Sequence, residues 1–144
     1  MPELTSIRDT TRRAAVTAAV GFGVVAFFQL LLALGAPWGQ AAWGGGQEGT
    51  LSQELRFAST ISMVIFIGAA IIVLGRAGYW GTRFSDLFRR GTWVLAVLLA
   101  LGALMNVASS SIWERFLWAP VALLLAFACL VVARSSTTRV AEEA

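Results

Sequence analysis

Four long apolar stretches, separated by short polar segments, make up most of this chain. The first runs from Ala14 to Leu34 without a charged residue, which is long enough for a helix to cross the ~30 Å hydrocarbon core of a bilayer. Three more apolar stretches follow, at 57–74, at 93–108 and in the segment that ends at Ala133. The pattern predicts an all-α membrane protein, a single domain of residues 1–144 that forms a bundle of four transmembrane helices.

Turn-forming and capping residues predict where these helices begin and end. Pro37 cannot continue the first helix, and Gly75 is a natural stop for the second. The segments Thr50–Gln53 and Ser111–Glu114 match the capping-box pattern that opens a helix. We therefore expect helices at about 14–35, 52–75, 92–109 and 112–133, an outer loop at 35–51 and a basic cytoplasmic loop at 76–91.

Two local irregularities are expected within this frame. Pro120 falls on the third turn of the fourth helix, where a proline predicts a kink. The segment Ser85–Phe88 predicts a short helix that lies on the membrane surface before the third transmembrane helix begins.

The arginines predict an orientation. All 11 basic residues are arginine, and about nine of them lie in the N-terminal arm, the 76–91 loop and the C-terminal tail. Arg56 and Arg115 lie near the opposite ends of the apolar stretches. Because basic residues accumulate on the cytoplasmic side, we expect both termini in the cytoplasm. The lack of lysine among many alanines and glycines is typical of a bacterial chain, so the predicted location is the bacterial inner membrane, and nucleic acid is not an expected partner.

Catalytic chemistry finds little support in the sequence. The chain has no histidine and one cysteine, Cys129, which lies within an apolar stretch and is best explained as a small buried side chain. No Asp, Glu or Arg lies inside an apolar stretch, whereas ion-coupled transporters and proton relays keep an ionisable group at membrane depth. We predict that the protein is not an enzyme and has no catalytic residue, metal site or cofactor.

Polar side chains within the predicted helices form a first set of candidate contacts. An amide in hydrocarbon needs a partner, which makes the glutamine and the asparagine the most informative. These side chains either bond between helices, which the sequence favours, or form a polar step in a pore or ligand site. The candidate intramembrane contacts are Gln29, Ser59, Ser62 and Asn106.

A second set of candidates lies on the predicted outer face. The glycine-rich loop carries two tryptophans, and two more lie near the start of the fourth helix. Such tryptophans usually anchor a protein at the membrane interface. Two ion pairs are candidates here and would draw the loop down as a lid, Glu54 with Arg115 or Glu114 with Arg56. The candidate lid or ligand site comprises Trp38, Trp43, Glu54, Arg56, Trp113, Glu114 and Arg115.

Several of these segments together resemble a set of small, uncharacterised four-helix bacterial integral membrane proteins. The resemblance rests on LGAPWG at 34–39, WGG at 43–45, WER at 113–115 and WAPV at 118–121, and it covers about residues 14 to 133. It implies the four-helix topology and carries no activity, cofactor or site residue with it.

The preferred function is a non-enzymatic accessory or interaction protein that packs in the lipid bilayer against itself or another membrane protein. Small residues recur at helical spacing and allow such close packing. They are Ala15, Ala19 and Gly23, then Ala96 and Ala100, then Ala122 and Ala126.

The alternative is a small carrier, channel or lipid-binding protein with an outward pocket under the Trp38/Trp43 loop. It requires the polar residues of the first, second and third helices to share one path. A membrane enzyme, the third reading, requires Glu54 or Glu114 to be buried.

Overall fold

The computed structural model describes residues 2–79 and 84–135 of the 144 in the chain. Within these residues, the long helices are α1 (Pro2–Leu34), α2 (Gln53–Arg76), α3 (Ser85–Ala108) and α4 (Ala119–Arg134). Two 3-10 turns, η1 (Gly39–Ala41) and η2 (Trp43–Gly45), lie between α1 and α2, and a π-helical turn, η3 (Glu114–Trp118), precedes α4. Four helical segments are long and apolar enough to cross a membrane, the last one being η3 with α4. The predicted fold class is confirmed.

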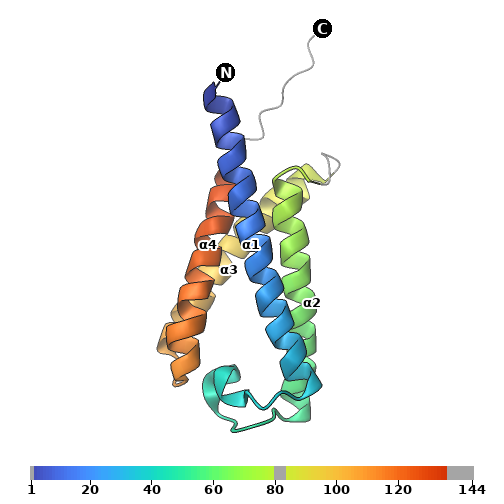
Figure 1. Ribbon diagram of the computed structural model, residues 1–144, viewed down its shortest axis with the longest axis vertical. Coiled ribbons are helices and arrows are strands. Elements are labelled where there is room, and N and C mark those ends of the chain that lie inside the picture. Colours follow the sequence, from blue (N-terminus) through green and yellow to red (C-terminus); the bar gives the residue numbers. More distant parts are fainter. Residues whose placement is uncertain (1, 80–83, 136–144) are drawn as a thin grey trace.

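The helices form two antiparallel pairs. Helix α1 lies beside α2, and α3 lies beside α4 (Figure 1). The pairs are close together at the end where α1 begins and α4 ends, which we call the terminal end. They spread apart toward the opposite end, the loop end, where residues 35–52 cross the opening between them (Figure 1).

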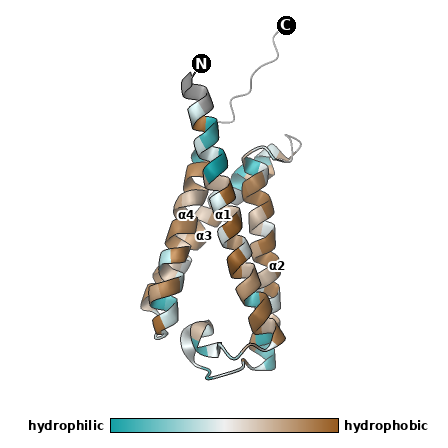
Figure 2. Cartoon of the chain, viewed as in Figure 1, coloured by the Kyte–Doolittle hydropathy of each residue, from teal (hydrophilic) through white to brown (hydrophobic). Residues whose placement is uncertain are grey.

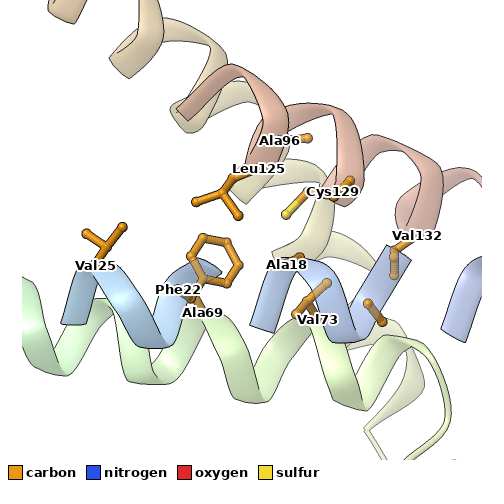
Figure 3. Close-up of a cluster of buried hydrophobic side chains, with 11 residues drawn as sticks. Ala18, Phe22, Val25, Ala69, Val73, Ala96, Leu125, Cys129 and Val132 are labelled. Atoms are coloured by element: carbon orange, nitrogen blue, oxygen red, sulfur yellow. The ribbon is translucent and has the colours of Figure 1, made fainter. Parts of the chain in front are cut away.

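The buried core occupies the terminal half of the bundle. Phe22 of α1 is its largest fully buried side chain, and its ring faces Leu125 and Cys129 of α4 (Figure 3). Small residues surround it, so the helices approach closely: a Cβ atom added to Gly21 would lie 2.5 Å from Cδ2 of Leu125. The core cluster comprises Ala15, Ala18, Phe22, Val25, Ala69, Val73, Ala96, Leu125, Ala128, Cys129 and Val132.

The outer surfaces of the helices are apolar. Side chains such as Val64, Leu104 and Leu124 are at least 60% exposed. Figure 2 shows hydrophobic residues along all four helices, with hydrophilic residues on α1 around residues 8–13. Such a surface suits contact with lipid chains.

Two helices begin earlier than predicted. Helix α1 starts at Pro2, not near 14, because the polar arm continues the helix; there Thr10 and Thr11 donate hydroxyl bonds to the carbonyls of Ser6 and Ile7. Helix α3 starts at Ser85, not near 92. Residues 80–83 of the predicted basic loop, Arg83 included, and Arg139 of the tail lie outside the described residues.

The separate surface helix predicted at Ser85–Phe88 is wrong. This segment is the first turn of α3, and Phe88 is buried against α2. A Cβ atom added to Gly75 would lie 2.7 Å from the ring of Phe88. The missing side chain at Gly75 thus lets the aromatic ring dock, and that contact holds the turn in the bundle.

The two predicted capping boxes behave differently. Helix α2 begins after Ser52, which makes no side-chain cap, while the Thr50 hydroxyl donates to the Gly35 carbonyl at 3.2 Å, so the first box is wrong. In the second, Ser111 Oγ accepts the Glu114 amide N–H at 3.3 Å, as predicted. The Glu114 side chain does not complete the box, because it bonds to the loop instead.

The irregularity predicted at Pro120 takes the form of the π turn η3. The Ala119 N–H donates to the Glu114 carbonyl, the i to i−5 bond of a π helix. Proline has no N–H to donate, so the regular i to i−4 ladder cannot continue through this position. Single π turns of this kind are frequent at functional sites.

Candidate ligand site beneath the interhelical loop

The 35–52 loop is a folded structure with its own backbone bonds. The Gly39 N–H donates to the Gly49 carbonyl at 2.8 Å, which closes the loop on itself. Gly44 and Gly45 have φ values of 82° and 71°, in the left-handed region that glycine enters without strain. Trp43 shares this conformation with φ of 55°, which is strained for a bulky residue. Its side-chain contacts must therefore stabilise it.

Three hydrogen bonds join the loop to the bundle, one to α2 and two to η3. The Trp43 indole Nε1 donates to Ser59 Oγ of α2 at 3.1 Å. The Gly44 N–H donates to the Glu114 carboxylate at 2.9 Å. The Trp118 indole Nε1 donates to the Ala41 carbonyl at 2.9 Å. The loop therefore bridges the two helix pairs at the end where they spread apart.

Two serines before α4 add further bonds to the loop. Ser111 Oγ donates to the Gln40 carbonyl at 2.6 Å, and Ser110 Oγ donates to the Gly44 carbonyl at 2.9 Å. Gly45 lies so close that an added Cβ atom would be 2.8 Å from Cβ of Ser111. The glycine-rich composition of the loop thus permits its close approach to the start of the fourth helix.

Aromatic rings pack against the loop and against one another at the loop end of the bundle. The Phe28 ring of α1 stacks on Trp38, with ring centroids 6.2 Å apart and planes tilted by 3°. On another side it packs against Trp118, with centroids 4.6 Å apart. Next to this group, Leu32, Ala42 and Leu51 form a small buried cluster of their own.

A cavity of about 260 Å³ lies between the loop and the core. Its roof is Ala41, Ala42 and Trp43 of the loop. The side of the cavity that faces the terminal end, which we call its floor, is formed by core residues. They are Val25, Phe66, Leu99 and Leu125, which belong to the core cluster or pack against it. Its walls are Phe28, Gln29, Asn106, Glu114, Trp118, Val121 and Ala122.

Gln29 and Asn106 bring side-chain amides to the lining of this cavity. The Gln29 Oε1 atom is buried and has no hydrogen-bond donor among the described residues. The Asn106 side chain, from α3, lines the same space. A buried amide without a partner costs free energy, about 1–3 kcal/mol, unless another molecule satisfies it. The cavity therefore presents polar groups suited to a ligand.

The predicted lid and ligand residues divide into two groups. Trp43 and Glu114 line the cavity, and Trp38 supports it through Phe28. The structure does not bring the other four to it. Glu54 and Trp113 are exposed. The guanidinium of Arg56 donates to the Ala33 carbonyl at 2.9 Å. The guanidinium of Arg115 donates to the Ser109 carbonyl at 2.7 Å.

The two predicted ion pairs are wrong. Across the described loop end, neither Glu54 and Arg115 nor Glu114 and Arg56 lie within ion-pair distance. Both arginines donate to a backbone carbonyl at the C-terminal end of the preceding long helix, Arg56 to Ala33 of α1 and Arg115 to Ser109 at the end of α3. Backbone carbonyls that lack a partner at the end of a helix attract these cations. The loop is held by hydrogen bonds and aromatic packing in place of ion pairs.

The predicted intramembrane contacts also divide. Gln29 and Asn106 face one cavity, and Ser59 is fully buried and joined to it through the Trp43 indole. Ser62 is half-buried and does not line the cavity. Three of the four predicted residues therefore converge, although they come from three different helices.

Two residues that line the cavity, Trp118 and Phe28, were not among the residues predicted for the ligand site. Trp118 follows Glu114 by four positions, a spacing that places both side chains on one face of a helix. Phe28 precedes Gln29, but the sequence carries no sign that its ring supports two tryptophans. The sequence could therefore have predicted Trp118, from its spacing to Glu114, but not Phe28.

The donor groups around this cavity suit an organic ligand better than a metal ion. Among the described residues, no three His, Cys, Asp or Glu side chains lie close enough together to bind a metal. The cavity offers one carboxylate, two amides and several aromatic rings. Comparison with protein-family models, with curated proteins and with solved structures finds no match to this chain.

Proposed function

We propose that this protein binds a small organic molecule in the cavity beneath the 35–52 loop, as a carrier or binding protein of the membrane. The observation that carries this proposal is the convergence of Gln29, Asn106 and Glu114 on one cavity roofed by Trp43. Ligand sites are typically concave, mostly apolar and equipped with a few convergent polar groups. This cavity has that composition.

A binding site fits the geometry better than a continuous pore. Between the floor and the terminal end, the core is filled by side chains such as Phe22 and Cys129, which are buried and apolar. A polar path would have to pass through this cluster to reach the terminal end. The cavity is therefore blind, and passage of a ligand across the membrane would require the helix pairs to move apart.

The accessory role favoured by the sequence receives less support. Its basis was the set of small residues at helical spacing, and Ala15, Ala96 and Ala126 from that set are buried within this chain. They serve the contacts among the four helices of one molecule. Association with itself or with another membrane protein remains the second hypothesis, with Gly23 as an open small position on α1.

The test is calorimetric binding of a panel of small aromatic molecules to the protein in lipid nanodiscs. Ala122 lines the cavity, so Ala122→Trp should fill it and abolish binding of every molecule that the native protein binds. Leu124→Trp is the matched control on the same helix, because Leu124 is 70% exposed and faces away from the bundle. Equal binding by both variants, or no binding by the native protein, would refute the proposal.

We further propose that the protein lies in a bacterial inner membrane with its terminal end in the cytoplasm. The support is the arginine distribution, with Arg8, Arg12, Arg13, Arg76, Arg89, Arg90 and Arg134 at the terminal end and two arginines at the loop end. A C-terminal alkaline phosphatase fusion should be inactive and a C-terminal fluorescent protein fusion bright. The reverse result would invert the orientation.

A further inference from the structure

We propose that the ligand of this cavity is a compact organic cation with N–H groups, such as a primary ammonium attached to an aromatic or short apolar group. The inference rests on the proposed function and specifies its ligand class. It follows from two features of the cavity: the carboxylate of Glu114 and the aromatic walls.

The two indole hydrogen-bond donors at the cavity are used within the fold. The Trp43 indole N–H is bound to Ser59, and the Trp118 indole N–H is bound to the Ala41 carbonyl. Acceptors remain available. The Glu114 carboxylate receives one backbone N–H and can accept further hydrogen bonds. A ligand that donates hydrogen bonds to this carboxylate matches its remaining capacity.

The charge of the cavity is negative. Glu114 is the one ionisable side chain among the described residues that line it. The two arginines of the loop end, Arg56 and Arg115, do not line the cavity, and they donate to the carbonyls of Ala33 and Ser109. In apolar surroundings a carboxylate without a counter-ion is costly, so a cation bound beside it is favoured. An anionic ligand would meet repulsion from the same group.

The walls suit an organic cation better than a hydrated metal ion. Phe28, Trp43, Phe66 and Trp118 line the cavity, and aromatic faces attract ammonium groups. The volume of about 260 Å³ lies just below the ~300–1,000 Å³ of pockets for drug-sized ligands, so the ligand is small. Its apolar part would rest on the floor formed by Val25 and Leu125.

The test compares three probes of similar shape and different charge: phenethylammonium, 2-phenylethanol and phenylacetate. Binding is measured by calorimetry to the full chain in nanodiscs of uncharged phosphatidylcholine, with empty nanodiscs as the blank for partitioning into lipid. We expect phenethylammonium to bind at least about tenfold more tightly than the alcohol, and phenylacetate to bind least.

The matched variants are Glu114→Gln and Glu54→Gln. Glutamine keeps an oxygen for the Gly44 N–H, so Glu114→Gln removes the charge and retains the loop contact. It should lower phenethylammonium affinity at least about tenfold and lower 2-phenylethanol affinity by a clearly smaller factor. Glu54 is exposed at the same end of the bundle, and Glu54→Gln should change neither affinity.

The outcomes separate the ligand class from the proposed function. If the alcohol or phenylacetate binds as tightly as phenethylammonium and Ala122→Trp abolishes that binding, the cavity is a ligand site and the cation assignment is wrong. If no probe binds, both fail. The comparison of probes on the native protein decides the assignment even if Glu114→Gln does not fold.

Discussion

The indole Nε1 of Trp43 donates a hydrogen bond of 3.1 Å to the hydroxyl of Ser59, a side chain that is fully buried in α2. This contact joins the most strained non-glycine residue of the loop, with φ of 55°, to the interior of the bundle. A left-handed conformation of a bulky residue costs about 1–3 kcal/mol and persists only where other contacts offset it. The Trp43–Ser59 bond is one of those contacts.

Removing this bond should loosen the loop while the bundle stays folded. Ser59→Ala and Trp43→Phe should each reduce loop protection by about 0.5–1.5 kcal/mol, and the double variant should cost less than the sum because both changes remove the same bond. Hydrogen exchange of the Gly39 amide, which is bound to Gly49, measures the effect. Ser62→Ala is the control on the same helix; additive single effects would contradict the prediction.

Trp118→Phe tests the contact between the fourth helix and the roof of the cavity. The smaller ring can still pack on Phe28, but the N–H that binds the Ala41 carbonyl is lost. We expect faster proteolysis within residues 39–50 and about 1 kcal/mol lower loop stability. Trp113→Phe, at a tryptophan that is 54% exposed, should leave the cleavage rate unchanged. Equal rates in the two variants would count against the contact.

Gly75→Ala should destabilise the α2–α3 contact at the terminal end. The added methyl group would lie 2.7 Å from the ring of Phe88, so the helices must separate or the ring must move, at about 1–3 kcal/mol. Gly68→Ala is the matched control on α2, since its added methyl group meets no atom within 4 Å. Thermal unfolding in detergent should show a lower Tm for Gly75→Ala and an equal or higher one for Gly68→Ala.

Cys129 reports on the closure of the core below the cavity. Its thiol is fully buried, so N-ethylmaleimide should not react with it in the folded protein and should react after unfolding in sodium dodecyl sulfate. Phe22→Ala should open a space in the same cluster and accelerate labelling. Phe27→Ala, at a ring that is 59% exposed on the same helix, should not. Rapid labelling of the native protein would mean that the cavity continues through its floor.

The four-helix architecture follows from local information. An uncharged apolar stretch of about twenty residues in lipid satisfies its backbone by forming a helix, whatever its neighbours are. The sequence also predicted the end of α1 before Pro37 and the Ser111 cap of the fourth helix, because both depend on adjacent residues. The early start of α3 was not, since it depends on Phe88 meeting Gly75 of another helix.

The sequence predicted several residues of the candidate site but not that they come together. Gln29, Asn106, Trp43 and Glu114 were recognisable by their residue types, as amides in apolar helices or as polar and aromatic groups near helix ends. Their convergence on one cavity was not, because they belong to four separate segments. The ion pairs were wrongly predicted for the same reason, because the sequence does not show which groups lie near the two arginines. In the structure, carbonyls at the ends of neighbouring helices bind them.

The sequence alone therefore determined the number and apolar character of the helices, the glycine-rich connection and the absence of histidine chemistry. The tertiary structure decided that the helix pairs spread apart at one end, that the loop covers the opening and that Gln29, Asn106 and Glu114 line one cavity next to the loop. The physical reason is the range of the interactions. Helix formation depends on neighbours within a few residues, whereas a cavity is defined by how far apart distant segments come to rest once their small and large side chains have packed.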